Sequence, residues 1–262
     1  MKILLTNDDG IYAPGLLALY ECLTSYHEVH VVAPESEMSA VGHCITLSRP
    51  LRIQKVSRKG AFFGYAVTGT PADCVKIAVQ ELFNGTPPDI ILSGINLGAN
   101  VGVNILYSGT VSAATEGAFL GVRSAAISLD ATKDPDFRFA AQFSRKVIRF
   151  MFSSGLKVNT ALNVNIPGIP PEKIKGVCVT RQATARVEER FERRSDPRGN
   201  VYYWLAGGKE SVEKSKPEVD SVALSENKIS ITPLYYDLTC EEEYERLKNQ
   251  PLPSFEELRL DL

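Results

Sequence analysis

The sequence is short of the residues on which several classes of protein depend. It has three histidines and five cysteines, and no two cysteines form a C-x-x-C pair. Neither a zinc site nor a disulfide framework is therefore predicted. No apolar run approaches the roughly 20 residues that cross a bilayer, so no membrane partner is expected. The first apolar run, Ile3 to Leu5, is too short for an export signal, and we expect a cytoplasmic protein.

An excess of basic charge is also missing. The 29 basic and 31 acidic side chains give a net charge of −2. The most charged stretch, residues 188–194, mixes both signs and is typical of a solvated face. A nucleic-acid partner is therefore not expected. Hydrophobic residues make up 44% of the 262 residues, which is ordinary for a globular protein.

The first half of the chain alternates between strand and helix patterns. Strands are predicted at 2–6, 28–34, 61–67, 89–92 and 125–129, and helices begin at Pro14, at Pro71 and near Val111. Such alternation predicts an α/β fold, in which a mostly parallel sheet lies between two layers of helices. Residues 45–47 and 51–53 suggest a small hairpin or an extended excursion from this sheet.

The second half has a different character. A helix over 134–152 and strands over 162–167 and 177–180 are followed, from about residue 183, by extended segments and turns. We predict a core over residues 1–182, and an extended β-hairpin arm with a terminal helix over 183–262. A capping box of Thr239 and Glu242 is expected to open that helix. The aromatic residues 202–204 suggest an interface, although they could instead fold back onto their own core.

Polar residues gather in the loops that follow the predicted strands. These loops are residues 7–10, 36–43, 68–73 and 93–100. The carboxyl ends of parallel strands share one edge of a sheet, where ligands bind. We therefore expect the four loops to lie together and to form the functional site.

Four side chains in these loops offer only oxygen ligands: Asp8, Asp9, Ser39 and Asn96. Oxygen ligands suit Mg²⁺ or Mn²⁺ better than Zn²⁺. A cation would also remove the repulsion between the adjacent carboxylates Asp8 and Asp9. The alternative is that Asp9 and Gly10 are only turn residues. On the metal hypothesis, Asp8, Asp9 and Asn96 are also the candidate catalytic residues.

A second feature is Ser108-Gly109-Thr110 at the start of a predicted helix. Hydroxyl groups and free backbone N–H groups at a helix N-terminus make a phosphate cradle, although Ser108 or Thr110 could be a simple N-cap. Asn7 and Asn100 are further candidates for orienting phosphate. A metal beside a phosphate cradle indicates metal-assisted phosphoester chemistry. His43 lies on the same edge and is a candidate for proton transfer.

Several alternative motifs are missing. The sequence has no G-x-x-x-x-G-K-[ST] loop, no G-x-G-x-x-G after the first strand and no G-x-S-x-G elbow. Two rivals stay open at this point. A haloacid-dehalogenase-like phosphatase would carry D-x-D, whereas Asp8 and Asp9 are adjacent. A nucleotide-binding regulator without turnover would keep the cradle and need no metal.

Six stretches of the chain resemble one family. They are ILLTNDDGIYAPG at 3–15, VVAPESEMSAVGHCITL at 31–47, VTGTPADCV at 67–75, ILSGINLGANVGVNILYSGTVSAATEG at 91–117, LNVNIP at 162–167 and SDPRGNVYYWLAG at 195–207. The chain resembles the SurE family of metal-dependent 5′/3′-nucleotidases, also called stationary-phase survival proteins. The motifs span most of the chain in the family's order. The first motif and the long glycine-rich one are the most specific.

This resemblance implies a Rossmann-like core with a C-terminal arm exchanged between subunits, and hence a homodimer or homotetramer. It implies one divalent metal ion at the positions of Asp8, Asp9, Ser39 and Asn96. The implied substrates are nucleoside 5′- and 3′-monophosphates, with some activity on short polyphosphate. The resemblance leaves open whether water attacks phosphorus directly or Asp8 does so first. The family often has glycine after the metal-binding serine, whereas this chain has Ala40.

Overall fold

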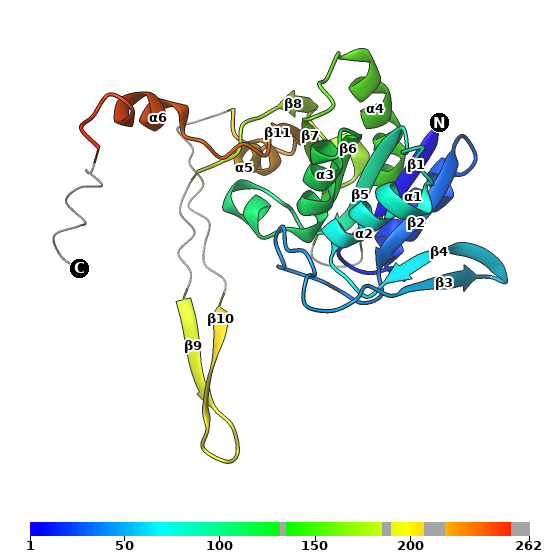
Figure 1. Ribbon diagram of the computed structural model, residues 1–262, viewed down its shortest axis with the longest axis horizontal. Helices are drawn as coiled ribbons and strands as arrows, with labels where there is room; N and C mark the ends of the chain where they lie inside the picture. The colour runs from blue at the N-terminus through cyan, green and yellow to red at the C-terminus, as the bar shows by residue number, and fades with distance from the viewer. Residues whose placement is uncertain (132–134, 185–189, 207–217, 253–262) are drawn as a thin grey trace.

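The computed structural model describes residues 1–131, 135–184, 190–206 and 218–252, and its arrangement is shown in Figure 1. The strands are β1 (Lys2–Thr6), β2 (Glu28–Pro34), β3 (Ile53–Arg58), β4 (Ala61–Val67), β5 (Ile90–Leu97), β6 (Arg123–Asp130), β7 (Ala161–Pro167), β8 (Val177–Val179), β9 (Arg190–Ser195), β10 (Val201–Ala206) and β11 (Ile229–Leu234). The helices are α1 (Pro14–Leu23), α2 (Pro71–Ile77), α3 (Gly109–Phe119), α4 (Arg138–Ser153), α5 (Asp220–Ser225) and α6 (Glu241–Leu247).

The main sheet runs in the order β3-β4-β2-β1-β5-β6-β7-β11-β8. Its central neighbours, from β4 to β7, pair in parallel, whereas β3 runs antiparallel to β4 and β11 antiparallel to β7. The predicted α/β fold with a mostly parallel sheet is therefore confirmed. No helix in the part of the chain that the structure describes is both long and apolar enough to cross a membrane.

Alternating side chains of the central strands build two apolar layers. Ile3 and Leu5 of β1 are fully buried in one cluster with residues of α1 and α4. Leu4 points to the opposite face and is fully buried in another cluster with residues of α2 and α3. This period of two, buried on both sides, is the reason that the first strand reads as a continuous apolar run. The sheet thus lies between two layers of helices.

The structure differs from the sequence prediction in several local features. Strand β5 continues to Leu97, five residues into the predicted glycine-rich loop. Residues 45–52 form no strand, and the hairpin at this edge joins β3 to β4 instead. Its turn residues Lys59 and Gly60 both have positive φ, as a two-residue hairpin turn requires. The short helix α5 is not anticipated. The predicted capping box of Thr239 and Glu242 is wrong, because the N-cap of α6 is Cys240, whose side chain makes no capping hydrogen bond.

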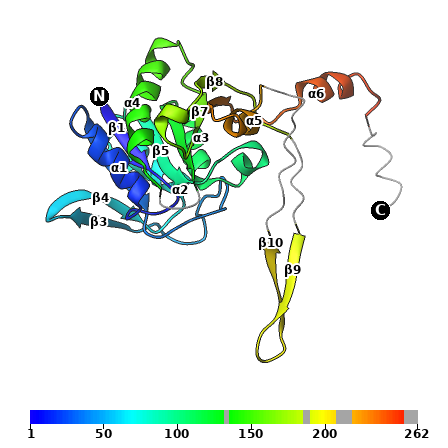
Figure 2. The ribbon, with the colours of Figure 1, turned by 180° about the vertical axis from the view of Figure 1, so that it is seen from behind.

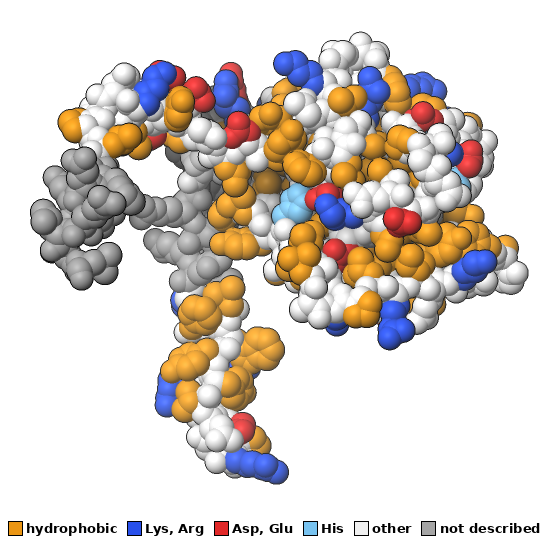
Figure 3. Space-filling model, in the orientation of Figure 1, with side chains coloured by type: hydrophobic (Ala, Val, Ile, Leu, Met, Phe, Trp, Pro, Cys, Tyr) orange, Lys and Arg blue, Asp and Glu red, His pale blue; other side chains and the backbone are white. Residues whose placement is uncertain are grey.

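Strands β9 and β10 form a separate antiparallel hairpin that stands away from the main body in both views (Figures 1 and 2). Phe191 is 70% exposed and Trp204 is 60% exposed. Hydrophobic side chains cover much of the hairpin in the space-filling view (Figure 3). The aromatic residues 202–204 therefore do not pack onto their own core. Residues 185–189, 207–217 and 253–262 of the predicted arm lie outside the described residues, and the division after residue 182 stays a prediction.

One close contact fixes helix α1 against the sheet. Gly15, in the first turn of α1, backs onto β5, where a Cβ atom added to it would lie 2.0 Å from the carbonyl oxygen of Ile95. Because the obstacle is backbone, it cannot move aside as a flexible side chain could. The contact holds the loop between β1 and α1, which carries Asp8 and Asp9, against the strand that carries Asn96.

We predict that Gly15→Ala lowers the free energy of unfolding by about 1–3 kcal/mol, the usual cost of overpacking. Helix propensity alone predicts the opposite sign, a gain of about 0.5–1 kcal/mol. Urea denaturation followed by circular dichroism measures the difference. Ala18→Gly, at a partly buried position one turn further along α1, is the matched control for propensity. A Gly15→Ala variant as stable as the parent protein would contradict this packing argument.

Candidate active site

Three hydrogen bonds bring the predicted loops together around Asp8 and Asp9. The N–H of Met38, next to Ser39, donates to the backbone oxygen of Asp8 at 2.7 Å. The backbone N–H of Leu97, next to Asn96, donates to the Asp9 carboxylate. The Thr110 hydroxyl donates to the Asp8 carboxylate. The loops after β1, β2 and β5 and the start of α3 therefore converge, as the topology of a parallel sheet predicts.

Asp8 lies against the N-terminus of α3. Its carboxylate also accepts a hydrogen bond from the backbone of Thr110, and the residue is only 5% exposed. A Cβ atom on Gly109 would lie 2.7 Å from Cβ of Asp8, so only glycine allows this approach. The positive end of the helix dipole stabilises a negative charge at this place. The first turn of α3 is therefore an anion site, and Asp8 takes part of it.

The two adjacent carboxylates repel each other when both are charged. Burial raises the pKa of Asp8 above its usual value, although the hydrogen bonds from Thr110 oppose this shift. Burial, followed by the negative charges of Asp8 and Glu37, raises the pKa of Asp9 to about 6. A cation between the carboxylates would remove both the desolvation penalty and the repulsion.

Buried oxygen atoms without partners occur next to this pair in the chain and on the neighbouring strand. Thr6 Oγ1, Asn7 Oδ1 and Ser93 Oγ are buried and have no hydrogen-bond partner among the residues that the structure describes. Thr6 and Ser93 are register partners at the ends of β1 and β5. Buried polar atoms of this kind normally bind water or an ion. The site thus fits a hydrated divalent cation held by oxygen atoms.

The donor set contains no dense cluster of titratable ligands. Within residues 1–131, 135–184, 190–206 and 218–252, no group of three or more His, Cys, Asp or Glu side chains is arranged to hold a metal. The predicted ligands are two carboxylates, a hydroxyl and an amide, so only two of the four are side chains of these types. Weak, oxygen-only sets of this composition suit Mg²⁺ or Mn²⁺.

Ser39 and Asn96 are chain neighbours of Met38 and Leu97, which bond the aspartates, whereas their own side chains bond other groups. The Ser39 hydroxyl donates to Glu37 at 2.5 Å, and Asn96 Nδ2 donates to the Gly98 oxygen at 2.9 Å. Glu37 is an additional acid at the site that the sequence analysis does not single out. Ala40 has φ 56°, in the left-handed region that favours glycine. Glycine, the residue that the family resemblance leads us to expect here, would adopt this conformation without strain.

The candidate phosphate-binding residues have different surroundings. Ser108 is the N-cap of α3, and its hydroxyl accepts from the Val111 N–H at 3.1 Å. Asn7 is fully buried and donates to the Gly10 oxygen at 2.9 Å, which shapes the turn after β1. Asn100 is buried, and its amide donates to Ser128 at 2.8 Å. Asn7 directly precedes Asp8 in the chain, and Ser108 directly precedes Gly109, which packs on Asp8.

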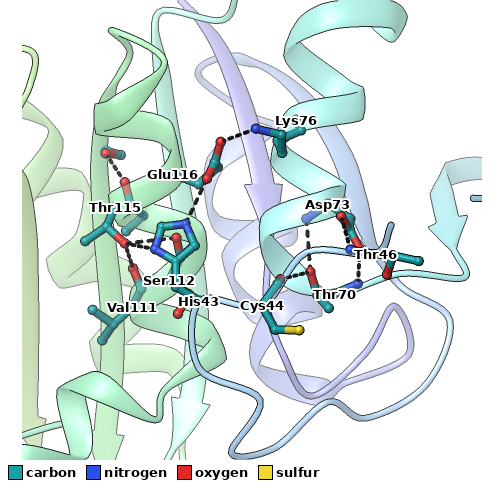
Figure 4. A network of polar contacts seen from close by, with 12 residues as sticks. His43, Cys44, Thr46, Thr70, Asp73, Lys76, Val111, Ser112, Thr115 and Glu116 are labelled. Atoms are coloured by element: carbon teal, nitrogen blue, oxygen red, sulfur yellow. Dashed lines mark hydrogen bonds and ion pairs between the residues drawn. The ribbon is translucent and has the colours of Figure 1, made fainter. Parts of the chain in front are cut away.

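His43, from the loop after β2, lies beside Thr115 and Glu116 of α3 (Figure 4). Its Nε2 atom is 2.8 Å from Glu116, which is about two helical turns beyond Ser108. Lys76 of α2 bonds the other oxygen of Glu116 at 3.0 Å. Burial raises the pKa of Glu116, but the hydrogen bonds from His43 and Lys76 outweigh it, so that the pKa lies below its usual value. This network fastens the loop after β2 to α2 and α3.

Comparisons with known proteins identify the family of the chain. The family described as survival protein SurE matches residues 3–189. The chain is 54% identical to a 5′-nucleotidase SurE of Syntrophus aciditrophicus (strain SB), covering 95% of this chain and 93% of that protein. It is 53% identical to a 5′-nucleotidase SurE of Syntrophobacter fumaroxidans (strain DSM 10017 / MPOB), covering 91% of this chain and 95% of the relative.

A solved structure shows the same fold. The crystal structure of the SurE protein from Aquifex aeolicus superposes with a TM-score of 0.82 at 38% sequence identity. The match covers 95% of this chain and 98% of that one. Since the family match spans residues 3–189 and the relatives align over nearly the whole length, this chain belongs to the SurE family of survival proteins.

Proposed function

We propose that this protein is a metal-dependent phosphomonoesterase that hydrolyses nucleoside monophosphates to a nucleoside and phosphate. One observation carries the proposal: Asp8, buried next to the half-buried Asp9, lies at the N-terminus of α3 and accepts a hydrogen bond from Thr110. The curated relatives support the substrate class, because each is named a 5′-nucleotidase. We propose 5′-monophosphates as the main substrates, and 3′-monophosphates and short polyphosphate as further ones.

Asp8, Asp9, Ser39 and Asn96 would hold one divalent ion, for which we propose Mg²⁺ or Mn²⁺. Such an ion, when bound, supplies Lewis-acid polarisation of a phosphate oxygen and lowers the pKa of a bound water. We propose that the unpartnered oxygens of Thr6, Asn7 and Ser93 would accept hydrogen bonds from waters around the ion.

The chain itself supplies the anion site. The first turn of α3, from Ser108 to Thr110, would offer a phosphate the positive end of the helix dipole, next to the Thr110 N–H that bonds Asp8. Thr110 holds the Asp8 carboxylate in a fixed place, which makes Asp8 a poor free nucleophile. We therefore propose direct attack by water rather than a phosphoaspartate. Asn7 and Asn100 are proposed to orient the loops on either side of the phosphate.

Two rival functions have less support. The relatives are named as nucleotidases rather than regulators, and the adjacent aspartates differ from the D-x-D of haloacid-dehalogenase-like phosphatases. The proton-transfer role of His43 stays a prediction, and its bond to Glu116 supports an anchoring role instead. All five cysteines are free, which supports the cytoplasm as the proposed compartment.

The test of the function is phosphate release from a panel of nucleoside monophosphates. We expect no release from chelator-treated protein, and recovery when Mg²⁺ or Mn²⁺ is added back. Asp9→Asn should lower kcat/KM by about 100-fold or more, because losing a metal ligand costs at least as much as losing a residue that hydrogen-bonds such a ligand. Asp136→Asn, which removes an exposed carboxylate paired with Arg138, is the matched control.

Release that survives full metal removal, or an Asp9→Asn variant as active as the control, would overturn the metal assignment. Nucleotide binding with no phosphate release under either metal would favour the regulator. Calorimetric titration of Mn²⁺ into both variants separates loss of metal from loss of chemistry.

We also propose that the β9–β10 hairpin joins copies of this chain. Its apolar side chains are exposed on both faces of the hairpin, which is unusual for a free surface. We expect the Tyr203→Ser/Trp204→Ser variant to have a lower assembly mass than the parent protein in size-exclusion chromatography with light scattering. Phe62→Ser, which removes an aromatic ring equally exposed on β4, should leave the mass unchanged. A parent protein of monomer mass would refute this role.

A further inference from the structure

The loop that connects β5 to α3 joins the two halves of the proposed site. It runs from Gly98 to Ser108 and contains one short 3-10 helix, Gly102–Leu106, with Asn96 just before the loop and the phosphate cradle at its end. At Gly98 the loop is still bonded to the sheet, since this N–H donates to the Leu129 oxygen at 2.8 Å. Beyond that point the path of the loop decides where the N-terminus of α3 lies relative to Asn96.

Side chains of β7 hold the first part of this loop. The N–H of Asn100 donates to Asn165 Oδ1 at 2.7 Å, and the Asn100 oxygen accepts from Asn163 at 2.7 Å and from Asn165 at 3.0 Å. Asn163 and Asn165 are both fully buried. The two asparagines of the LNVNIP stretch thus take the place of a neighbouring strand for Asn100.

Two other side chains hold the next part of the loop in the same way. The N–H of Gly102 donates to Asp220 Oδ2 at 3.0 Å, and Gln182 Nε2 donates to the Gly102 oxygen at 2.8 Å. Asp220 is fully buried, and its other oxygen accepts from the N–H groups of Ala183 and Ser221 at 3.0 Å and 2.8 Å. Gly102 has φ 56°, a conformation that favours glycine, and both its N–H and its carbonyl are bonded in that conformation.

Gln182 and Asp220 belong to the two ends of the chain segment that contains the hairpin arm. Gln182 comes before β9 and Asp220 comes after β10. The two ends are joined to each other, because the Arg181 N–H donates to the Glu218 oxygen at 2.8 Å and the Asp220 N–H to the Arg181 oxygen at 2.9 Å. The base of the arm and the connecting loop are therefore one hydrogen-bonded unit.

We propose that Asp220 and Gln182 are positioning residues for phosphate binding, which hold Gly102 and so place the N-terminus of α3 beside Asp8. This inference rests on the proposed phosphomonoesterase function. The carboxylate is well suited to this task, since it accepts three N–H groups and has no donor of its own to leave unpaired. Without these hydrogen bonds, the backbone of several loop residues would be free to move. Phosphate binding would then have to fix each of them, at a cost in conformational entropy.

The test compares Asp220→Asn and Gln182→Glu with the parent protein. Asp220→Asn keeps the shape but turns an NH₂ group toward a backbone N–H. Gln182→Glu replaces the donor to the Gly102 oxygen with a carboxylate. We expect each variant to raise KM for a nucleoside monophosphate and the inhibition constant of inorganic phosphate by about tenfold, the effect of one lost hydrogen bond to a charged or buried partner. We expect kcat to change less, and the affinity for Mn²⁺ to stay unchanged.

Thr232→Val is the matched control for lost stability. Thr232 is buried in β11 and bonds the Thr180 hydroxyl at 2.7 Å. It does not belong to the loop clamp, by which we mean the hydrogen bonds of Asp220 and Gln182 to Gly102. We expect this control to lower the unfolding temperature without changing KM. Values of KM and of the phosphate inhibition constant within twofold of the parent protein, in both folded variants, would overturn the proposal. If Asp220→Asn does not fold, Gln182→Glu decides the question.

Amide hydrogen exchange of the 98–108 peptide in metal-free protein gives a readout that does not depend on activity. Faster exchange in both variants, but not in Thr232→Val, supports the clamp, whereas unchanged exchange overturns it. A parent protein without phosphatase activity would refute the proposed function. The exchange measurement would still decide whether Asp220 and Gln182 hold the loop.

Discussion

The site depends on the contact between a buried carboxylate and the start of a helix. Asp8 packs against Gly109 so closely that no side chain fits between them, and it bonds the Thr110 hydroxyl. The helix N-terminus supplies positive potential, which partly offsets the cost of burying Asp8 next to Asp9. Because this contact fixes α3 against β1, the phosphate cradle and the metal ligands are placed by the same interaction.

Side chains replace sheet hydrogen bonds where the chain leaves the sheet near this contact. The segment from Gly98 to Ser108 would otherwise be a long loop beside a charged site, where conformational freedom weakens binding. Two asparagines of β7 together bond the N–H and the carbonyl of Asn100. Asp220 and Gln182 do the same for Gly102. The site is therefore supported from the rigid sheet on one side and from the base of the arm on the other.

Much of this architecture could be predicted from local patterns. Apolar runs that alternate with helical spacing indicate the parallel sheet, and the helix starts at Pro14 and Pro71 are confirmed by the structure. The extension of β5 to Leu97 was missed, because Gly94 and Gly98 read as loop residues. The asparagines of β7 carried a usable signal, since two polar residues spaced by two within an apolar strand share one face.

The sequence by itself determined the fold class, the sheet edge where polar loops gather and the oxygen character of the ligand set. These features depend on short-range periodicity, on connection rules and on side-chain chemistry, which a single chain displays directly. Only the tertiary structure decided that Thr110 holds Asp8, that His43 bonds Glu116 and that Asp220 holds Gly102. Each of these pairs joins residues more than seventy positions apart, and no local pattern specifies which distant partner will complete a buried hydrogen bond.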